Sequence, residues 1–145
     1  MIVRSLALEG FRNYEALHVD FHPQVNLIYG DNAQGKTNLI EAIYLLTGQK
    51  SFRAAKENDY PRFGQEVARI EAEFTCQNRE KTAALAYGSK KLAWLNGVEC
   101  APSELTGEFL AVVFSPGELA LIQEGPSERR AFLDGAISQV MPRYM

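Results

Sequence analysis

Residues 30–37 read Gly30-Asp31-Asn32-Ala33-Gln34-Gly35-Lys36-Thr37, and this stretch decides the fold. It matches the pattern Gly-x4-Gly-Lys-Thr, follows the apolar run 25–29 and leads into a helical pattern over 38–46. A strand, a loop and a helix in this order are the context that a phosphate-binding loop requires. Glycines let the backbone wrap closely around phosphates, and the N–H groups at a helix N-terminus direct positive charge at an anion. The stretch therefore predicts binding of a nucleoside triphosphate.

The side chains of this loop have separate expected roles. Lys36 can reach the β- and γ-phosphates, and the Thr37 hydroxyl can ligate Mg²⁺. Asn32 and Asn38 flank the phosphates and are candidates for nucleotide contacts. The predicted nucleotide-binding residues in this part of the chain are Gly30, Asp31, Asn32, Ala33, Gln34, Gly35, Lys36, Thr37 and Asn38. Thr37 is the only predicted metal ligand, and no catalytic residue is predicted.

Composition limits the class of protein. The chain has 145 residues, 46% of them hydrophobic, which suffices for one core that buries about 70% of the unfolded surface. The net charge of −3 gives no general attraction to nucleic acid, so any DNA contact would need a local basic patch. Cys76 and Cys100 lie far apart, which argues against a zinc site or a disulfide framework. No stretch resembles a signal peptide or a membrane span, so we expect a cytoplasmic protein without a membrane partner.

Hydrophobic spacing predicts the other elements. Strands are expected at 2–9, 17–21, 25–29, 70–76, 81–87, 91–95, 98–100 and 109–114. Residues 10–14 look like a connecting turn, and residues 49–66 like a surface loop. Leu39, Ile40, Ile43 and Leu46 should pack one face of the helix on a sheet. Asn96-Gly97 predicts a two-residue hairpin turn. The fold class is α/β, with an antiparallel β-meander after the phosphate loop and an amphipathic C-terminal helix beginning near Ser127.

The sequence shows only half of a hydrolytic site. Hydrolysis needs an acidic residue at the end of a second apolar strand to hold Mg²⁺, and a group that positions water. The apolar run 109–114 ends instead in Ser115-Pro116. The missing half must lie in another segment, or the protein only binds its nucleotide.

Several further stretches resemble the RecF family, which comprises bacterial recombination and gap-repair ATPases related to SMC and ABC-type ATPases. They are 8–14, 30–43, 50–53, 114–119 and 125–134. The resemblance implies a P-loop NTPase fold of the ABC/SMC head type. Residues 1–126 would form its N-terminal lobe, and residues 127–145 would begin a helical segment that is cut short. It also implies a longer protein, with an acidic Mg²⁺ motif and a signature motif in the C-terminal part.

The family resemblance also implies partners. ATP would be held between two protomers of an ATP-dependent homodimer, so hydrolysis would need a complete chain and a dimer. The full-length protein would be a DNA-dependent ATPase that binds single-strand/double-strand junctions at gaps. It would help to load recombinase together with recombination mediator proteins.

The resemblance adds individual residues to the expected site. Arg12 would contact a nucleotide phosphate, the alternative being a solvated arginine in a turn. Arg53 resembles an arginine that links DNA contact to ATP turnover in SMC-like proteins, the alternative being a salt bridge within the loop. Ala33 stands where SMC-like relatives often carry Gly, which should be harmless if its φ is negative. Ser115 stands near the place of a Mg²⁺- and water-sensing Gln, which puts the usual role of that segment in doubt.

Arg129 and Arg130 open the last helix, where cations oppose the helix dipole. They have either a role beyond helix stability or an ion pair with Glu128 or Asp134.

Two other classes of function make different demands on the sequence. A small stand-alone P-loop kinase or GTPase would need an apolar strand ending in Asp or an Asn-Lys-x-Asp guanine motif, and neither occurs. A folded interaction fragment without useful nucleotide binding remains open.

Overall fold

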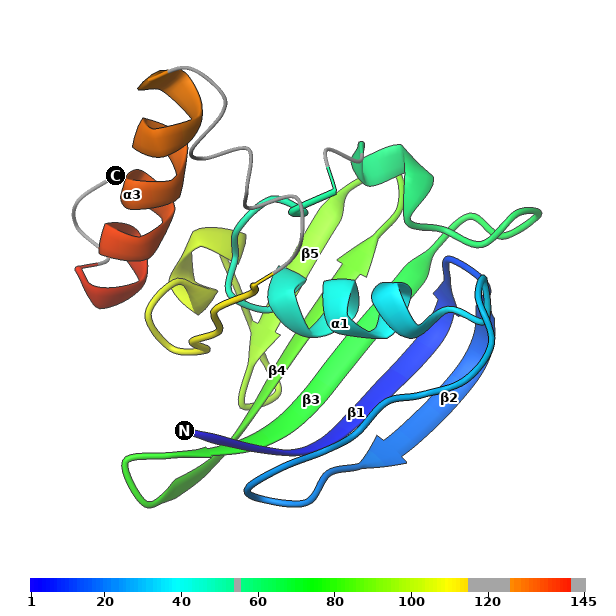
Figure 1. Ribbon diagram of the computed structural model, residues 1–145, viewed down its shortest axis with the longest axis horizontal. Coiled ribbons are helices and arrows are strands. Elements are labelled where there is room, and N and C mark those ends of the chain that lie inside the picture. The colour runs from blue at the N-terminus through cyan, green and yellow to red at the C-terminus, as the bar shows by residue number, and fades with distance from the viewer. Residues whose placement is uncertain (54–55, 115–125, 142–145) are drawn as a thin grey trace.

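A computed structural model describes residues 1–53, 56–114 and 126–141. Its centre is one antiparallel sheet in the order β2-β1-β3-β4-β5-β6, with helix α1 across one face (Figure 1). The strands are β1 (Ile2–Phe11), β2 (Tyr14–Asp20), β3 (Ala68–Cys76), β4 (Arg79–Tyr87), β5 (Lys91–Leu95) and β6 (Val98–Cys100). The helices are α1 (Lys36–Leu45) and α3 (Pro126–Val140), with short 3-10 helices η1 (Glu57–Asp59) and η2 (Pro102–Leu105).

The meander forms as its alternation predicts. Ile70, Ala72 and Phe74 of β3 are buried, and they alternate with the more accessible residues Glu71 and Glu73. Side chains of a strand point alternately to its two faces, so one face of β3 joins the core. The turn between β5 and β6 uses Asn96 and Gly97 at φ 52° and 77°. Positive φ at both positions is what a tight hairpin demands, which confirms that prediction.

Strands β1 and β2 run further toward their shared turn than the sequence suggested. Phe11 pairs with Tyr14, so the connection shrinks from the predicted 10–14 to the two residues Arg12 and Asn13. The segment after α1 is fixed to this end of β1. The amide of Arg12 donates to the Tyr60 carbonyl at 2.8 Å, and that of Arg62 donates to the Gly10 carbonyl at 2.7 Å. The turn thus lies between α1 and the loop that carries η1.

Helix α1 covers the sheet with a face slightly different from the predicted one. Leu39, Ala42, Leu45 and Leu46 are buried, and Ile43 is partly buried against the core. Ile40, which was expected on this face, is 36% exposed. Each buried leucine stabilises the fold by roughly 1.5–3 kcal/mol.

Two predicted strands do not form. Within the described residues, segments 25–29 and 110–114 pair with no strand, and Phe109 makes one isolated bridge to Thr106. Val112 and Phe114 are 89% and 91% exposed, and Val25, Leu27 and Tyr29 are also exposed. A strand needs a neighbour to satisfy its N–H and C=O groups, and apolar content alone does not supply one. The prediction of strands at 25–29 and 109–114 is therefore wrong for this structure.

Helix α3 begins at Pro126, so Ser127 lies inside the helix and not at its cap. Its proline fits the first helical position because no N–H is needed there. Ser138 is fully buried and accepts a hydrogen bond from Gln49 Nε2 at 2.9 Å. The predicted apolar stripe is mostly accessible, with Phe132 at 47% and Val140 at 81% exposure. No helix among the described residues is long and apolar enough to cross a membrane. Ser115 lies outside the described residues.

Candidate nucleotide-binding site

The phosphate loop leads directly into the N-terminus of α1. Gly30 and Gly35 have φ values of 146° and 100°, which favour glycine, and Gly35 is the N-cap of the helix. The Lys36 ammonium donates to the Gly30 carbonyl at 2.7 Å and also to the Asp31 carbonyl. Thr37, one residue further, is exposed. The loop therefore brings a lysine, a hydroxyl and the positive end of a helix together, a combination suited to an anion.

The tip of the loop is accessible, and one of its residues is strained. Asp31, Asn32, Ala33 and Gln34 are all exposed. Ala33 has a φ of 64°, so the negative φ that was expected to make it harmless is not present. A side chain in this left-handed region costs roughly 1–2 kcal/mol because Cβ approaches the following carbonyl.

The β1–β2 turn lies directly behind the phosphate loop. Asn13 Nδ2 donates to the Gln34 carbonyl at 3.3 Å. A Cβ added to Gly35 would lie 2.6 Å from Asn13 Nδ2 and 2.9 Å from the Tyr14 hydroxyl. Glycine is required at position 35 by this close approach as well as by its φ.

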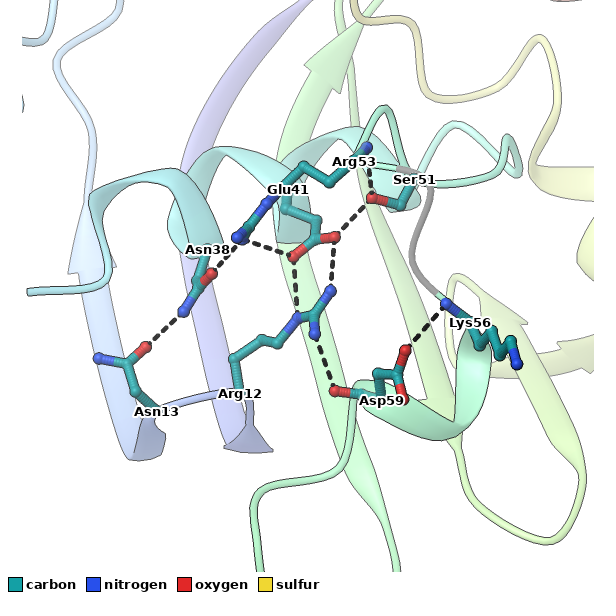
Figure 2. Close-up of polar contacts among 8 residues, drawn as sticks. All are labelled: Arg12, Asn13, Asn38, Glu41, Ser51, Arg53, Lys56 and Asp59. Atoms are coloured by element: carbon teal, nitrogen blue, oxygen red, sulfur yellow. Dashed lines mark hydrogen bonds and ion pairs between the residues drawn. The ribbon is translucent and has the colours of Figure 1, made fainter. Parts of the chain in front are cut away.

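A buried carboxylate, that of Glu41, organises the polar contacts around α1 (Figure 2). Glu41 is fully buried and accepts from Arg12 Nε at 3.0 Å and Nη2 at 2.9 Å. Ser51 Oγ donates to the same carboxylate at 2.5 Å, and Arg53 Nη1 lies 3.5 Å from it. Two guanidinium groups around one carboxylate leave this side of α1 with a net positive charge, which favours an anionic ligand nearby.

Arg12 uses its guanidinium inside the protein. Besides its two bonds to Glu41, Nη1 donates to the Asp59 carbonyl at 3.0 Å, and the group lies 5.2 Å from the centre of the Tyr60 ring. Burial raises the pKa of Tyr60, and the nearby Glu41 charge raises it further. The structure thus places Arg12 against α1 and η1. These bonds use three of the five N–H groups of the guanidinium, so one N–H on each of Nη1 and Nη2 is left for another acceptor.

Arg53 and Asn38 lie together on the phosphate-loop side of this cluster. Arg53 Nη1 donates to Asn38 Oδ1 at 2.5 Å, and Asn38 Nδ2 donates to Asn13 Oδ1 at 2.8 Å (Figure 2). The salt bridge of Arg53 is made to Glu41 of α1, and not within its own loop as the alternative explanation had it. Arg130, in contrast, bonds to the Pro126 carbonyl of its own helix at 3.3 Å, and Arg129 is exposed.

Sequence reasoning missed Asn13, Glu41 and Ser51. Glu41 precedes the buried Leu45 by four residues, so both lie on the same side of the helix. A carboxylate on that side needs a partner, and Arg12 and Arg53 were already candidates. Asn13 gave no comparable signal, because a turn asparagine is ordinary.

Comparisons with known proteins support the family resemblance described from the sequence. A family model described as an AAA domain matches residues 5–103. The chain belongs to this AAA domain family. It is 44% identical over 146 residues to the DNA replication and repair protein RecF of Clostridioides difficile (strain 630), covering 99% of this chain and 39% of that protein. The RecF of Thermoanaerobacter sp. (strain X514) is 38% identical, with coverages of 100% and 41%. The resemblance to RecF found in the sequence is confirmed.

Solved structures agree with the family and with the fold. A structure of the recombination mediator protein RecF-ATP superimposes with a TM-score of 0.93 at 37% identity, over 99% of this chain and 39% of that chain. An SMC head bound to the C-winged helix domain of ScpA shares the fold, with a TM-score of 0.75 at 22% identity over 96% of this chain and 53% of that one. The ABC/SMC-like α/β fold class is therefore confirmed. The chain spans about two fifths of the RecF relatives that it matches.

Proposed function

We propose that the chain is the ATP-binding part of a RecF-type DNA replication and repair protein. One observation carries this proposal: the loop 30–35 delivers Lys36 and Thr37 at the N-terminus of α1, in a chain 37% identical to a RecF whose structure is named for its ATP complex. The triphosphate would lie along Gly30–Thr37, with Lys36 at the β- and γ-phosphates and Asn32 and Asn38 beside them.

The loop residues fit a magnesium nucleotide. Thr37 is exposed in the second position of α1, and a Cβ at Gly30 would meet nothing within 4 Å, so the approach to the loop is open. The Thr37 hydroxyl would ligate Mg²⁺, which neutralises charge between the β- and γ-phosphates when bound. The Lys36 ammonium would leave the carbonyls of Gly30 and Asp31 to contact the phosphates. Arg12 would contact a phosphate with the N–H groups of Nη1 and Nη2 that its bonds to Glu41 and Asp59 leave unused.

Hydrolysis would need parts beyond this chain. The chain covers 39–41% of its relatives. Among the described strands only β2 ends in an acid, Asp20, and it is an accessible edge strand and not a buried apolar one. Segments 25–29 and 110–114 carry the apolar content of strands and are exposed except at positions such as Ile28 and Ala111, which supports pairing with strands from the rest of the protein. Residues 1–126 would then be an N-terminal lobe and 127–145 the start of a helical segment. ATP turnover would require the complete chain as an ATP-dependent dimer.

The remaining functions come from the family. The whole protein would bind DNA at single-strand/double-strand junctions in the cytoplasm and would act with recombination mediator proteins to load recombinase. Arg53 would sense DNA. In this chain, the net positive charge of the cluster around Glu41 supports contact with DNA.

A titration of labelled ATP tests the nucleotide site. We expect Lys36→Ala to weaken ATP binding by about tenfold or more, because a charge-assisted contact contributes about 1.5–3 kcal/mol. Lys90→Ala is a matched control, since Lys90 is exposed in the β4–β5 turn. Equal and weak binding by the unmodified protein, Lys36→Ala and Lys90→Ala would reject ATP binding and favour a fragment that only mediates interactions.

A further inference from the structure

A one-way chain of hydrogen bonds reaches the back of the phosphate loop. Arg53 donates to Asn38, Asn38 donates to Asn13, and Asn13 donates to the Gln34 carbonyl (Figure 2 shows the first two bonds). The two ends fix its direction, because a guanidinium can only donate and a carbonyl can only accept. Each asparagine therefore has a single amide orientation that satisfies both of its neighbours.

Asn13 is presented to the loop by a rigid turn. The preceding residue, Arg12, is bonded to buried Glu41, and its amide donates to Tyr60. The following residue, Tyr14, pairs with Phe11 in the sheet. The Asn13 amide also lies so close to Gly35 that a Cβ there would approach within 2.6 Å of Nδ2. The turn thus supports the loop by contact and by a hydrogen bond.

The bond to Gln34 has a consequence for the phosphate side of the loop. No peptide bond among the described residues is cis, so the carbonyl of Gln34 and the N–H of Gly35 point in opposite directions from one planar unit. Holding the carbonyl toward Asn13 therefore directs the Gly35 N–H away from the turn. N–H groups of such a loop are the donors that hold phosphates.

We propose that Asn13 is a positioning residue of the nucleotide site, which fixes the Gln34–Gly35 peptide so that its N–H is available to a phosphate. This inference rests on the proposed ATP site and assigns the β1–β2 turn a part in it. Asn38 and Arg53 hold the Asn13 amide in the donating orientation.

Hydrogen exchange of the ligand-free protein tests the positioning without ATP. In Asn13→Ala we expect amide exchange in segment 30–37 to become roughly three- to tenfold faster, the range for one hydrogen bond, with the β3–β4 hairpin unchanged. Asn13→Asp should behave alike, because a carboxylate accepts from Asn38 but cannot donate to Gln34. Asn58→Ala is the matched control, since Asn58 is exposed in η1. Should Asn13→Ala fail to fold, the nearly isosteric Asn13→Asp carries the test.

ATP titration of the same variants connects the turn to binding. Affinity should fall roughly three- to tenfold in Asn13→Ala and remain unchanged in Asn58→Ala. The inference would be overturned if, in Asn13→Ala, both the amide exchange rate of segment 30–37 and the affinity for ATP stayed within about twofold of the unmodified protein. Faster loop exchange in a protein that shows no Lys36-dependent ATP binding would reject the proposed ATP site, while showing that Asn13 fixes the Gln34–Gly35 peptide.

Discussion

Arg12 and Glu41 form a two-point ion pair, with Nε and Nη2 of the guanidinium 3.0 Å and 2.9 Å from the two carboxylate oxygens. Glu41 is fully buried, and the Arg12 side chain is 18% exposed. The pair holds the β1–β2 turn against α1. It also keeps Arg12 at a φ of 56°, a conformation that costs about 1–3 kcal/mol and persists only where surrounding contacts enforce it.

Glu41→Gln should lower the free energy of unfolding by about 3 kcal/mol. The substitution keeps the shape of the side chain but leaves Arg12 and Arg53 without their carboxylate, and breaking a buried pair on one side is costly. Urea unfolding followed by circular dichroism measures the change. Glu80→Gln provides the comparison, because Arg4 and Glu80 pair at 55% and 79% exposure, where a loss within about 0.5 kcal/mol is expected. Similar losses in the two variants would contradict the stated role of Glu41.

The features that could be predicted from the sequence are those that depend on local patterns. The phosphate loop, the helix after it and the β5–β6 turn each depend on neighbouring residues, and all three are where the sequence placed them. The bonds from Arg12 to Glu41 and from Asn13 to Gln34 join residues more than 20 positions apart, and no local pattern encodes such a pairing. Segments 25–29 and 109–114 failed for a related reason. Their apolar content suits a strand, but strand formation requires partners that the described residues do not provide.

Ala33→Gly should relieve strain in the phosphate loop. Ala33 has a φ of 64°, which an alanine adopts at a cost of roughly 1–2 kcal/mol, while glycine makes the unfolded chain more flexible by about 0.4–1 kcal/mol. The net expectation is a gain of about 0.5 kcal/mol, measured by urea unfolding. Asp31→Gly is a control at the same loop tip, because Asp31 has no positive φ to relieve. A clear loss of stability in Ala33→Gly would show that the loop depends on the alanine side chain.

Tyr87→Phe should make the protein more resistant to alkali. Burial raises the pKa of the Tyr87 phenol, and the charges of nearby groups raise it further. Below about pH 10 the phenol is neutral in both states; above it, the unfolded chain ionises while the folded protein does not, so stability falls as the pH rises. The wild type should therefore lose up to about 1.4 kcal/mol per pH unit relative to Tyr87→Phe.

Tyr87→Phe should not lower the stability of the protein at neutral pH. The Tyr87 hydroxyl is buried without a hydrogen-bond partner among the described residues, so its removal should change stability by about 0 to +1 kcal/mol. Urea unfolding at pH 7, 10 and 11 measures both effects. Tyr29→Phe serves as the control, because Tyr29 is 85% exposed. Parallel pH curves for the wild type and Tyr87→Phe would contradict the raised pKa.

Gly35→Ala should destabilise the protein more than Gly97→Ala. Both glycines have positive φ, at 100° and 77°, so each substitution incurs backbone strain of about 1–2 kcal/mol. Only at Gly35 does the new Cβ also meet atoms, at 2.6 Å from Asn13 Nδ2 and 2.9 Å from the Tyr14 hydroxyl, whereas nothing lies within 4 Å at Gly97. The Asn13 amide cannot easily move aside, because it is bonded to Gln34 and to Asn38.

A double-mutant cycle isolates that contact. Asn13→Ala removes the amide that a new Cβ at position 35 would meet. Gly35→Ala should therefore cost about 1 kcal/mol less in the Asn13→Ala background than in the wild type. Gly97→Ala combined with Asn13→Ala should be additive, because the two positions share no contact. Urea unfolding of the wild type and the five variants gives both coupling energies. Additivity at Gly35 would mean that the Asn13 amide does not restrict the phosphate loop, and that backbone strain and the Tyr14 hydroxyl account for the need for glycine.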